Sequence, residues 1–266
     1  MNRSGMYWLV LVFGIPIAVL MTGLGGVLSP IGLGLGLLFA AVYLVAGVLL
    51  FRAGPLWPSA GGLYVLSCLA WGAGVSLALV ALPSTAWLEI TDKLGWEVLA
   101  ASFGGAYPEE IAKAAGVLLI LYCSRRLNRP WHGFVTGGLV GLGFEVNENL
   151  SYGAMGALLD ANSDFAGVLA MWGMRAVAGP GLHVALTAIA GWGIGQAMFQ
   201  RKSLSKLWWI GAAMLLHFLW NVMPASEELA FVQYGVLTMV IYPLFIWLYV
   251  KCVRLNKIDN SYVLLM

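Results

Sequence analysis

Long stretches without charged residues dominate the pattern of hydrophobic and polar positions. The first extends from Tyr7 to Phe51 and contains no charged side chain. Such stretches are typical of helices that cross a bilayer, because a helix needs about 20 apolar residues to span the hydrocarbon core. The alternating ten-residue segments of a membrane β-barrel do not occur. The pattern therefore predicts an all-α, polytopic membrane helix bundle.

Eight apolar segments qualify as transmembrane helices. They are residues 7–28, 31–51, 60–82, 106–124, 131–153, 181–199, 207–224 and 230–250. No internal repeat or long linker interrupts them, so we expect a single integral membrane domain over residues 1–266. A continuous helix over 166–199 would be about 51 Å long, which is too long for one span. Gly179-Pro180-Gly181 predicts a break there. We expect 166–178 to form an outer-face or re-entrant helix, and 154–180 to act as a gate.

The charged residues between these segments predict the orientation. With a cytoplasmic N-terminus, eleven of the fourteen basic residues fall in cytoplasmic segments, among them Arg3, Arg201 and Lys202. The outer loops then hold only Lys93 among basic residues, together with seven acids. This distribution follows the positive-inside rule. We expect both termini in the cytoplasm and the protein in the cytoplasmic membrane.

Composition supports the membrane assignment and excludes other classes. Hydrophobic residues make up 61% of the chain and charged residues 10%, whereas soluble domains carry about 25% charged residues. A net charge of +2 is too small to indicate nucleic-acid binding. The three cysteines show no C-x-x-C spacing and predict neither a disulfide framework nor a metal site.

Ionisable residues inside the predicted spans are the candidates for function, because such groups are costly in a bilayer. They are Glu109, Glu110, Lys113, Glu145, Glu148, Arg175, His183 and His217. The first three spans contain none, so we expect them to be scaffold. A rise of 1.5 Å per residue, counted from the cytoplasmic end of each span, places four residues about 22–27 Å above that end. They are Glu110, Glu148, His183 and Asn221. Four helices therefore bring polar groups to one level in the outer half of the bilayer.

Helical spacing groups these residues further. Glu145, Glu148 and Asn149 share a face, and Gly133, Gly137 and Gly141 continue the same ridge, which predicts close approach of a neighbouring helix. Three further pairs stand four residues apart: Glu109 and Lys113, His183 and Thr187, and His217 and Asn221.

Three residues near the ends of these spans allow further predictions. Pro108 suits a first helical turn, which would place the two adjacent glutamates at a helix N-terminus. Arg175 is expected to be a counter-ion for the acids, and His132 to lie at the membrane interface.

Four blocks of residues resemble the PrsW family of membrane proteases, which is distantly related to the CAAX prenyl endopeptidases and bacteriocin-immunity proteins. They are E-E-x-x-K at Glu109–Lys113, F-x-x-x-E-N within Gly141–Tyr152, H-x-x-x-T at His183–Thr187, and H-x-x-x-N at His217–Asn221. The resemblance implies scaffold spans in 1–105, a protease core in 106–223, and a last span with a cytoplasmic tail in 224–266. It also implies membrane-anchored substrates, such as anti-sigma factors, cleaved near the extracytoplasmic face.

Two mechanisms fit these residues. Without a metal, Glu109 or Glu110 activates water, His217 and Asn221 stabilise the oxyanion, and His183 assists proton transfer. With a metal, His183, His217 and Glu148 bind Zn²⁺, and Glu109 or Glu110 is the general base. The supporting residues in either version are Lys113, Glu145, Asn149, Arg175 and Thr187.

Two other functional classes use buried ionisable residues. A proton- or ion-coupled transporter also places glutamates and histidines inside a membrane, often in broken helices. A non-catalytic membrane scaffold retains them for packing. The absence of inverted repeats and the common depth of the charges favour the protease.

Overall fold

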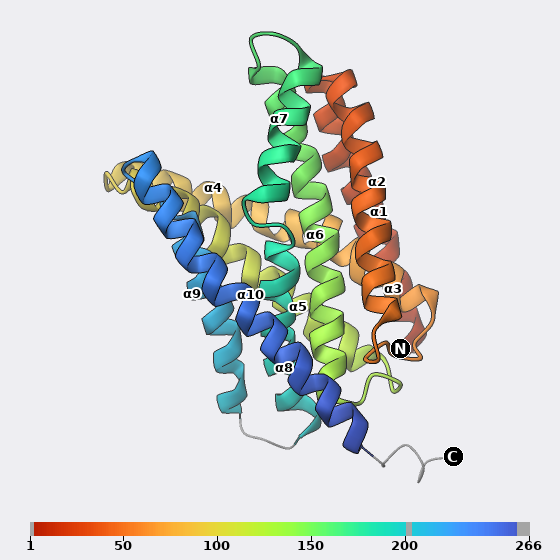
Figure 1. Cartoon of the computed structure of the whole chain (residues 1–266). Coiled ribbons are helices and arrows are strands. Elements are labelled where there is room, and N and C mark those ends of the chain that lie inside the picture. Colours follow the sequence, from red (N-terminus) through yellow and green to blue (C-terminus); the bar gives the residue numbers. More distant parts are fainter. Residues whose placement is uncertain (1–2, 201–203, 260–266) are drawn as a thin grey trace.

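The computed structural model describes residues 3–200 and 204–259, and within these ranges the chain forms helices and no strands (Figure 1). The α-helices are α1 (Arg3–Leu28), α2 (Pro30–Ala53), α3 (Gly62–Ala70), α4 (Leu77–Lys93), α5 (Tyr107–Cys123), α6 (Pro130–Leu159), α7 (Asp164–Val177), α8 (Leu182–Phe199), α9 (Trp208–Asn221) and α10 (Glu227–Ile258). The described residues also form four short helical segments. Two are π-helical, η1 (Trp71–Ser76) and η3 (Ser102–Ala106), and two are 3₁₀-helical, η2 (Glu97–Leu99) and η4 (Leu204–Leu207). The predicted all-α fold is confirmed.

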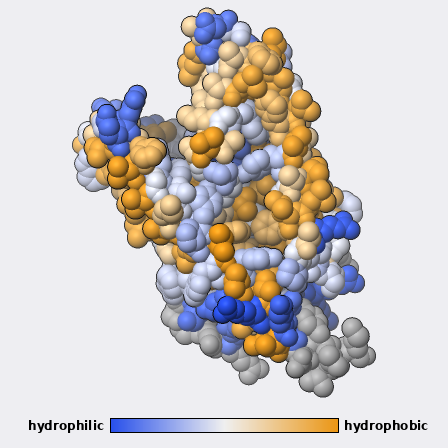
Figure 2. Space-filling view, viewed as in Figure 1, coloured by the Kyte–Doolittle hydropathy of each residue, from blue (hydrophilic) through white to orange (hydrophobic). Residues whose placement is uncertain are grey.

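Five helical stretches are long and apolar enough to cross a membrane. They are Gly5–Leu28, Pro30–Ala53, Gly62–Lys93, Asp164–Phe199 and Glu227–Ile258. Large apolar side chains on these stretches face outward, and their hydrophobic surface is visible in Figure 2. Such exposure is unfavourable in water and natural in lipid, so the protein is a multi-pass integral membrane protein.

The exact number of spans and their orientation remain predictions. The three expected spans beyond the five stretches correspond to α5, α6 and α9, of which α6 lies in the middle of the bundle and α9 at its edge (Figure 1). Helix α1 begins and α10 ends at the same end of the molecule, as an even number of crossings requires (Figure 1). Arg201 and Lys202, which belong to the predicted cytoplasmic set, lie outside the described residues.

The predicted break between α7 and α8 is present. Gly179 and Gly181 both adopt positive φ angles, 92° and 71°, which glycine tolerates because it lacks a Cβ. Pro180, between them, has no N–H to continue a helix. Helix α8 therefore starts as an independent element, with His183 in its first turn.

The chain enters α5 differently from the expectation. The turn η3 runs without interruption into α5, and the residue before α5, Ala106, has helical backbone angles. Glu109 and Glu110 thus follow a π-turn and do not stand at a free helix N-terminus. The physical reason is Pro108, which cannot donate a backbone hydrogen bond and crowds the preceding turn, so that the helix widens there.

Helices α6 and α8 form the centre of the bundle, and each is the other's most extensive partner. A Cβ placed on Gly133, Gly137 or Gly141 would lie only 2.1–2.2 Å from a backbone oxygen of α8. The two backbones are therefore in direct contact along three turns, as the glycine ridge predicts. This contact fixes the height of α8 against α6.

We predict that Gly137→Ala separates these helices, because its Cβ would meet the carbonyl oxygen of Thr187 at 2.1 Å. Overpacking of this kind destabilises by about 1–3 kcal/mol, and a chain of this size loses about 2–4 °C per kcal/mol. The thermal unfolding midpoint in detergent should fall accordingly. Gly211→Ala on α9, where a Cβ would meet nothing within 4 Å, is the control. Equal midpoints for the two variants would contradict the contact.

Candidate active site

Helices α5, α6, α8 and α9 bring the sequence-predicted residues into one cluster. The cluster consists of Glu109, Glu110, Lys113, Glu148, His183 and His217. Both histidines and the two adjacent glutamates are at most 8% exposed. The predicted meeting of carboxylates and imidazoles from separate helices is therefore what the structure shows.

Glu109 lies at the centre of the cluster. Its Oε2 atom is 3.9 Å from His183 Nδ1 and 3.9 Å from His217 Nε2. The two imidazoles meet edge to face, with ring centroids 5.0 Å apart. One carboxylate oxygen and two ring nitrogens thus converge on a common point.

Each histidine is held on its other ring nitrogen by a carboxylate. His183 Nε2 pairs with Glu148 Oε2 at 2.8 Å, and His217 Nδ1 pairs with Glu110 Oε1 at 2.9 Å. Carboxylates in this position select the tautomer and orientation of an imidazole whose opposite nitrogen binds a metal or a proton. In both residues the nitrogen opposite the carboxylate faces Glu109.

Lys113 supplies a buried positive charge beside the glutamates. Its Nζ lies 2.7 Å from Glu110 Oε1, 3.5 Å from Glu109 Oε2 and 2.9 Å from His183 Nδ1. The ammonium also stands 4.3 Å from the centre of the Phe144 ring. It therefore offsets the repulsion between the two adjacent carboxylates.

Arg175 occupies the outer side of the cluster, where the sequence predicts a counter-ion. Its Nη2 atom contacts Glu148 Oε2 at 2.5 Å, and its Nε donates a hydrogen bond to Asn149 Oδ1. The guanidinium also lies over the Tyr152 ring at 4.6 Å. Helix α7 is thus tied to the same carboxylate that orients His183.

Asn221 and Thr187 lie at the margins of the cluster. Asn221 Nδ2 donates to the Ala101 carbonyl at 3.2 Å, and a Cβ on Gly105 would touch both this nitrogen and Glu109 Oε1, at 3.1 and 3.3 Å. Asn221 and Glu109 therefore both border the space next to Gly105. The Thr187 hydroxyl is buried and has no hydrogen-bond partner among the described residues.

Glu145 and His132, which the sequence analysis also considered, lie outside the cluster. The Glu145 carboxylate accepts hydrogen bonds from the backbone at the start of α8. His132 is buried at the opposite end of α6, where its Nδ1 accepts from the Arg129 N–H at 3.3 Å. The sequence placed Glu145 among the supporting residues, but no pattern in it showed that the carboxylate reaches α8.

The residues at the centre fit a metal ion. The ligand atoms of Glu109, His183 and His217 all lie within 4.8 Å of one another. Tetrahedral zinc with bonds of about 2.0–2.1 Å places its ligand atoms about 3.3 Å apart, so the observed 3.9 Å separations need little closing. Glu109 Oε2 is buried and accepts no hydrogen bond within the described part of the chain. The geometry thus favours Glu109 over Glu148 as the third donor.

The cluster is most exposed on the side of α7. In Figures 1 and 2 the upper ends of α4 and α10 splay away from α7, and the surface is notched between them. The side chains of Glu148 and Arg175 remain 18% and 23% exposed. The cluster is therefore buried but not sealed.

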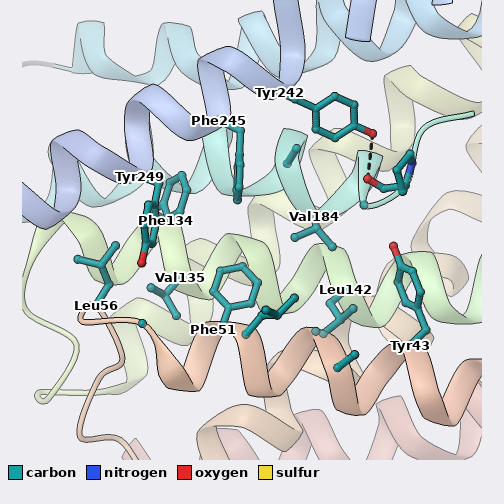
Figure 3. Close-up of a pocket in the computed structure, with 17 residues that line it drawn as sticks. Tyr43, Phe51, Leu56, Phe134, Val135, Leu142, Val184, Tyr242, Phe245 and Tyr249 are labelled. Carbon is teal, nitrogen blue, oxygen red and sulfur yellow. Dashed lines mark hydrogen bonds between the residues drawn. The ribbon is translucent and has the colours of Figure 1, made fainter. Parts of the chain in front are cut away.

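A cavity of about 460 Å³ lies elsewhere, between α2 and α10 (Figure 3). Its walls are apolar and aromatic side chains, among them Phe51, Phe134 and Phe245, together with three tyrosines. None of the clustered glutamates and histidines lines it. Pro180 and Gly181, just before α8, line one end of this cavity.

Comparison with known proteins agrees with this site. The family described as "PrsW family intramembrane metalloprotease" matches residues 62–248. No curated protein and no solved structure matches the chain. Since the family match spans well over half of the chain and includes every residue of the cluster, the chain belongs to the PrsW family of intramembrane metalloproteases.

Proposed function

We propose that this protein is an endopeptidase that hydrolyses peptide bonds of single-pass membrane proteins near the extracytoplasmic face of the cytoplasmic membrane. The observation that carries the proposal is the position of Glu109 Oε2, which has no hydrogen-bond partner within the described residues and is equidistant from two imidazoles. Residues 106–223 form the protease core in this proposal, residues 1–105 a scaffold, and 224–266 a last span and tail. Anti-sigma-factor-like proteins are the expected substrate class.

A divalent metal is supported by the donor set. Glu109, His183 and His217 would hold the ion, and two imidazoles with one carboxylate are a set that suits zinc. When bound, such an ion activates water and polarises the scissile carbonyl. Glu148 and Glu110 orient the two imidazoles from behind.

The other residues of the cluster have separate roles in the proposed hydrolysis. Water adds to the carbonyl carbon, the C–N bond breaks, and the proton lost by water passes to the leaving amine. Glu110 is our candidate for the proton carrier, since its Oε2 atom has no hydrogen-bond partner among the described residues. Lys113 lies within 3.5 Å of both glutamates, and Asn221 Nδ2 and Glu109 Oε1 both lie next to Gly105, so these two donors suit the developing oxyanion.

A metal-free version has one observation in its favour. Lys113 Nζ already contacts His183 Nδ1 at 2.9 Å, and a metal would have to displace it. In this version Glu109 activates water between the imidazoles, His217 and Asn221 stabilise the oxyanion, and His183 assists proton transfer. The reaction and the substrate class are unchanged, and metal content separates the two versions.

We predict that Glu109→Gln weakens Zn²⁺ binding far more than Glu148→Gln. Glu109 contributes a ligand atom in the proposed site, whereas Glu148 only orients His183, and loss of such an orienting group weakens binding by about 10–100-fold. Equilibrium dialysis of the detergent-purified protein against Zn²⁺ measures both. If Glu148→Gln abolishes binding while Glu109→Gln retains it, Glu148 is the ligand. If the wild type binds no Zn²⁺, the metal-free version stands.

We also predict that Glu110→Gln lowers cleavage by about 10²–10⁴-fold, the contribution typical of a general acid–base group. The assay is cleavage of a panel of single-pass membrane proteins in proteoliposomes, with the cut sites located by mass spectrometry. Glu97→Gln, the same substitution at an exposed position, should stay within about two-fold of the wild type. Absence of cleavage for every panel member, combined with a proton flux that Glu110→Gln removes, would favour a transporter.

A further inference from the structure

Glu145 belongs to the glycine ridge of α6. Gly133, Gly137, Gly141 and Glu145 follow one another at intervals of four residues, and therefore lie in one row along the helix. The three glycines contact the backbone of α8. Glu145, the next position in the row, reaches the point where α8 begins.

Four hydrogen-bond donors converge on the Glu145 carboxylate. Oε1 accepts from the Gly181 N–H at 2.8 Å and from the Tyr43 hydroxyl at 2.6 Å. Oε2 accepts from the N–H groups of His183 and Val184, at 3.0 and 3.5 Å. The residue is 2% exposed. Both oxygens thus have hydrogen-bond partners, whereas the Oε2 atoms of Glu109 and Glu110 have none within the described residues, so Glu145 is not our candidate for the proton carrier.

Helix α8 needs this carboxylate because it has no cap of its own. The first N–H groups of a helix have no partner within the helix, and the residue before α8 is Gly181, which has no side chain to supply one. An anion at this end also interacts favourably with the helix dipole. Glu145 provides the cap from a neighbouring helix.

Two tyrosines hold the same turn from opposite walls of the apolar cavity (Figure 3). Tyr43 of α2 donates to Glu145, and Tyr242 of α10 donates to the Pro180 carbonyl at 2.9 Å. The start of α8 is therefore fixed by α6, α2 and α10 together. This arrangement restrains Pro180 and Gly181, the two residues directly before α8, and His183 follows two positions later.

We propose that Glu145 is a positioning residue for His183. It fixes the backbone of α8 so that His183 Nδ1 faces Glu109 while Nε2 faces Glu148, one helical turn above Glu145 on α6. Tyr43 assists by holding the carboxylate. The effect on catalysis rests on the proposed function, whereas the effect on the His183 ring does not depend on it.

Glu145→Gln tests the proposal because it keeps the size of the side chain and replaces one acceptor with an amide that donates. An N–H group of α8 then loses its partner, and the His183 ring should change its environment. The chain contains three histidines, His132, His183 and His217. Selective ¹⁵N-histidine labelling of the detergent-purified protein therefore reports each ring separately, without any substrate.

We expect Glu145→Gln to shift or broaden the His183 ring signals and to leave those of His132 unchanged. Tyr43→Phe removes one of the four donors and should give a smaller shift in the same direction. The matched control is Tyr64→Phe, which removes another buried hydrogen bond to α6, the one between the Tyr64 and Thr136 hydroxyls at 2.9 Å. It should leave the His183 signals in place, although it also costs a buried contact.

Cleavage kinetics provide the second measurement. Glu145→Gln should lower kcat by about 10–100-fold, as for other groups that orient a ligating histidine, with KM within about three-fold. Tyr64→Phe should leave both unchanged to within about two-fold.

Unchanged His183 signals in Glu145→Gln overturn the proposal, as does an equal shift in Tyr64→Phe. If Glu145→Gln fails to fold, Tyr43→Phe decides: an unshifted His183 then overturns it. Shifted signals without any cleavage by the wild type contradict the proposed function alone.

Discussion

The direct backbone contact between α6 and α8 is the constraint on which the site depends. Glycines at three successive turns of α6 bring α8 so close that its carbonyl oxygens occupy the space of the missing Cβ atoms. Because this contact allows little sliding, it sets the height of His183 against α6. Glu145 and Glu148, farther along the same helix, then meet the start of α8 and the His183 ring. Packing without polar groups thus determines where the polar groups meet.

The cluster concentrates charge that a bilayer otherwise opposes. Burying an ion costs several kcal/mol even after relaxation, and four carboxylates with one lysine lie in or beside the cluster. A network retained only for structure would satisfy all of its acceptors. Here Glu145 and Glu148 accept hydrogen bonds, whereas Glu109 Oε2 and Glu110 Oε2 accept none within the described residues. In the proposed function, these two oxygens are the ones that bind the metal or the reacting water.

The sequence predicts the composition of this site better than its geometry. Charged residues within apolar segments identify the candidates, and a rise of 1.5 Å per residue places them at one depth. Depth does not determine how far each helix is rotated about its axis or how it is tilted. Sequence reasoning therefore chose Glu148 as the third metal ligand, whereas Glu109 Oε2 is the carboxylate oxygen that faces both imidazoles. The π-turn before α5 was not predicted, because Pro108 is equally common in the first turn of an ordinary helix.

The break before α8 and the cap provided by Glu145 are two aspects of one requirement. Non-helical backbone at membrane depth is tolerated only where its polar groups find partners inside the protein. Here the Gly181 N–H donates to Glu145, the Pro180 carbonyl accepts from Tyr242, and the Leu182 N–H donates to the Gly179 carbonyl. Without the break, α7 and α8 would form one long helix, and the first turn of α8 would have no free N–H groups for Glu145. The glycines at 179 and 181 therefore allow the chain to present His183 at a helix start, where a carboxylate from α6 can hold it.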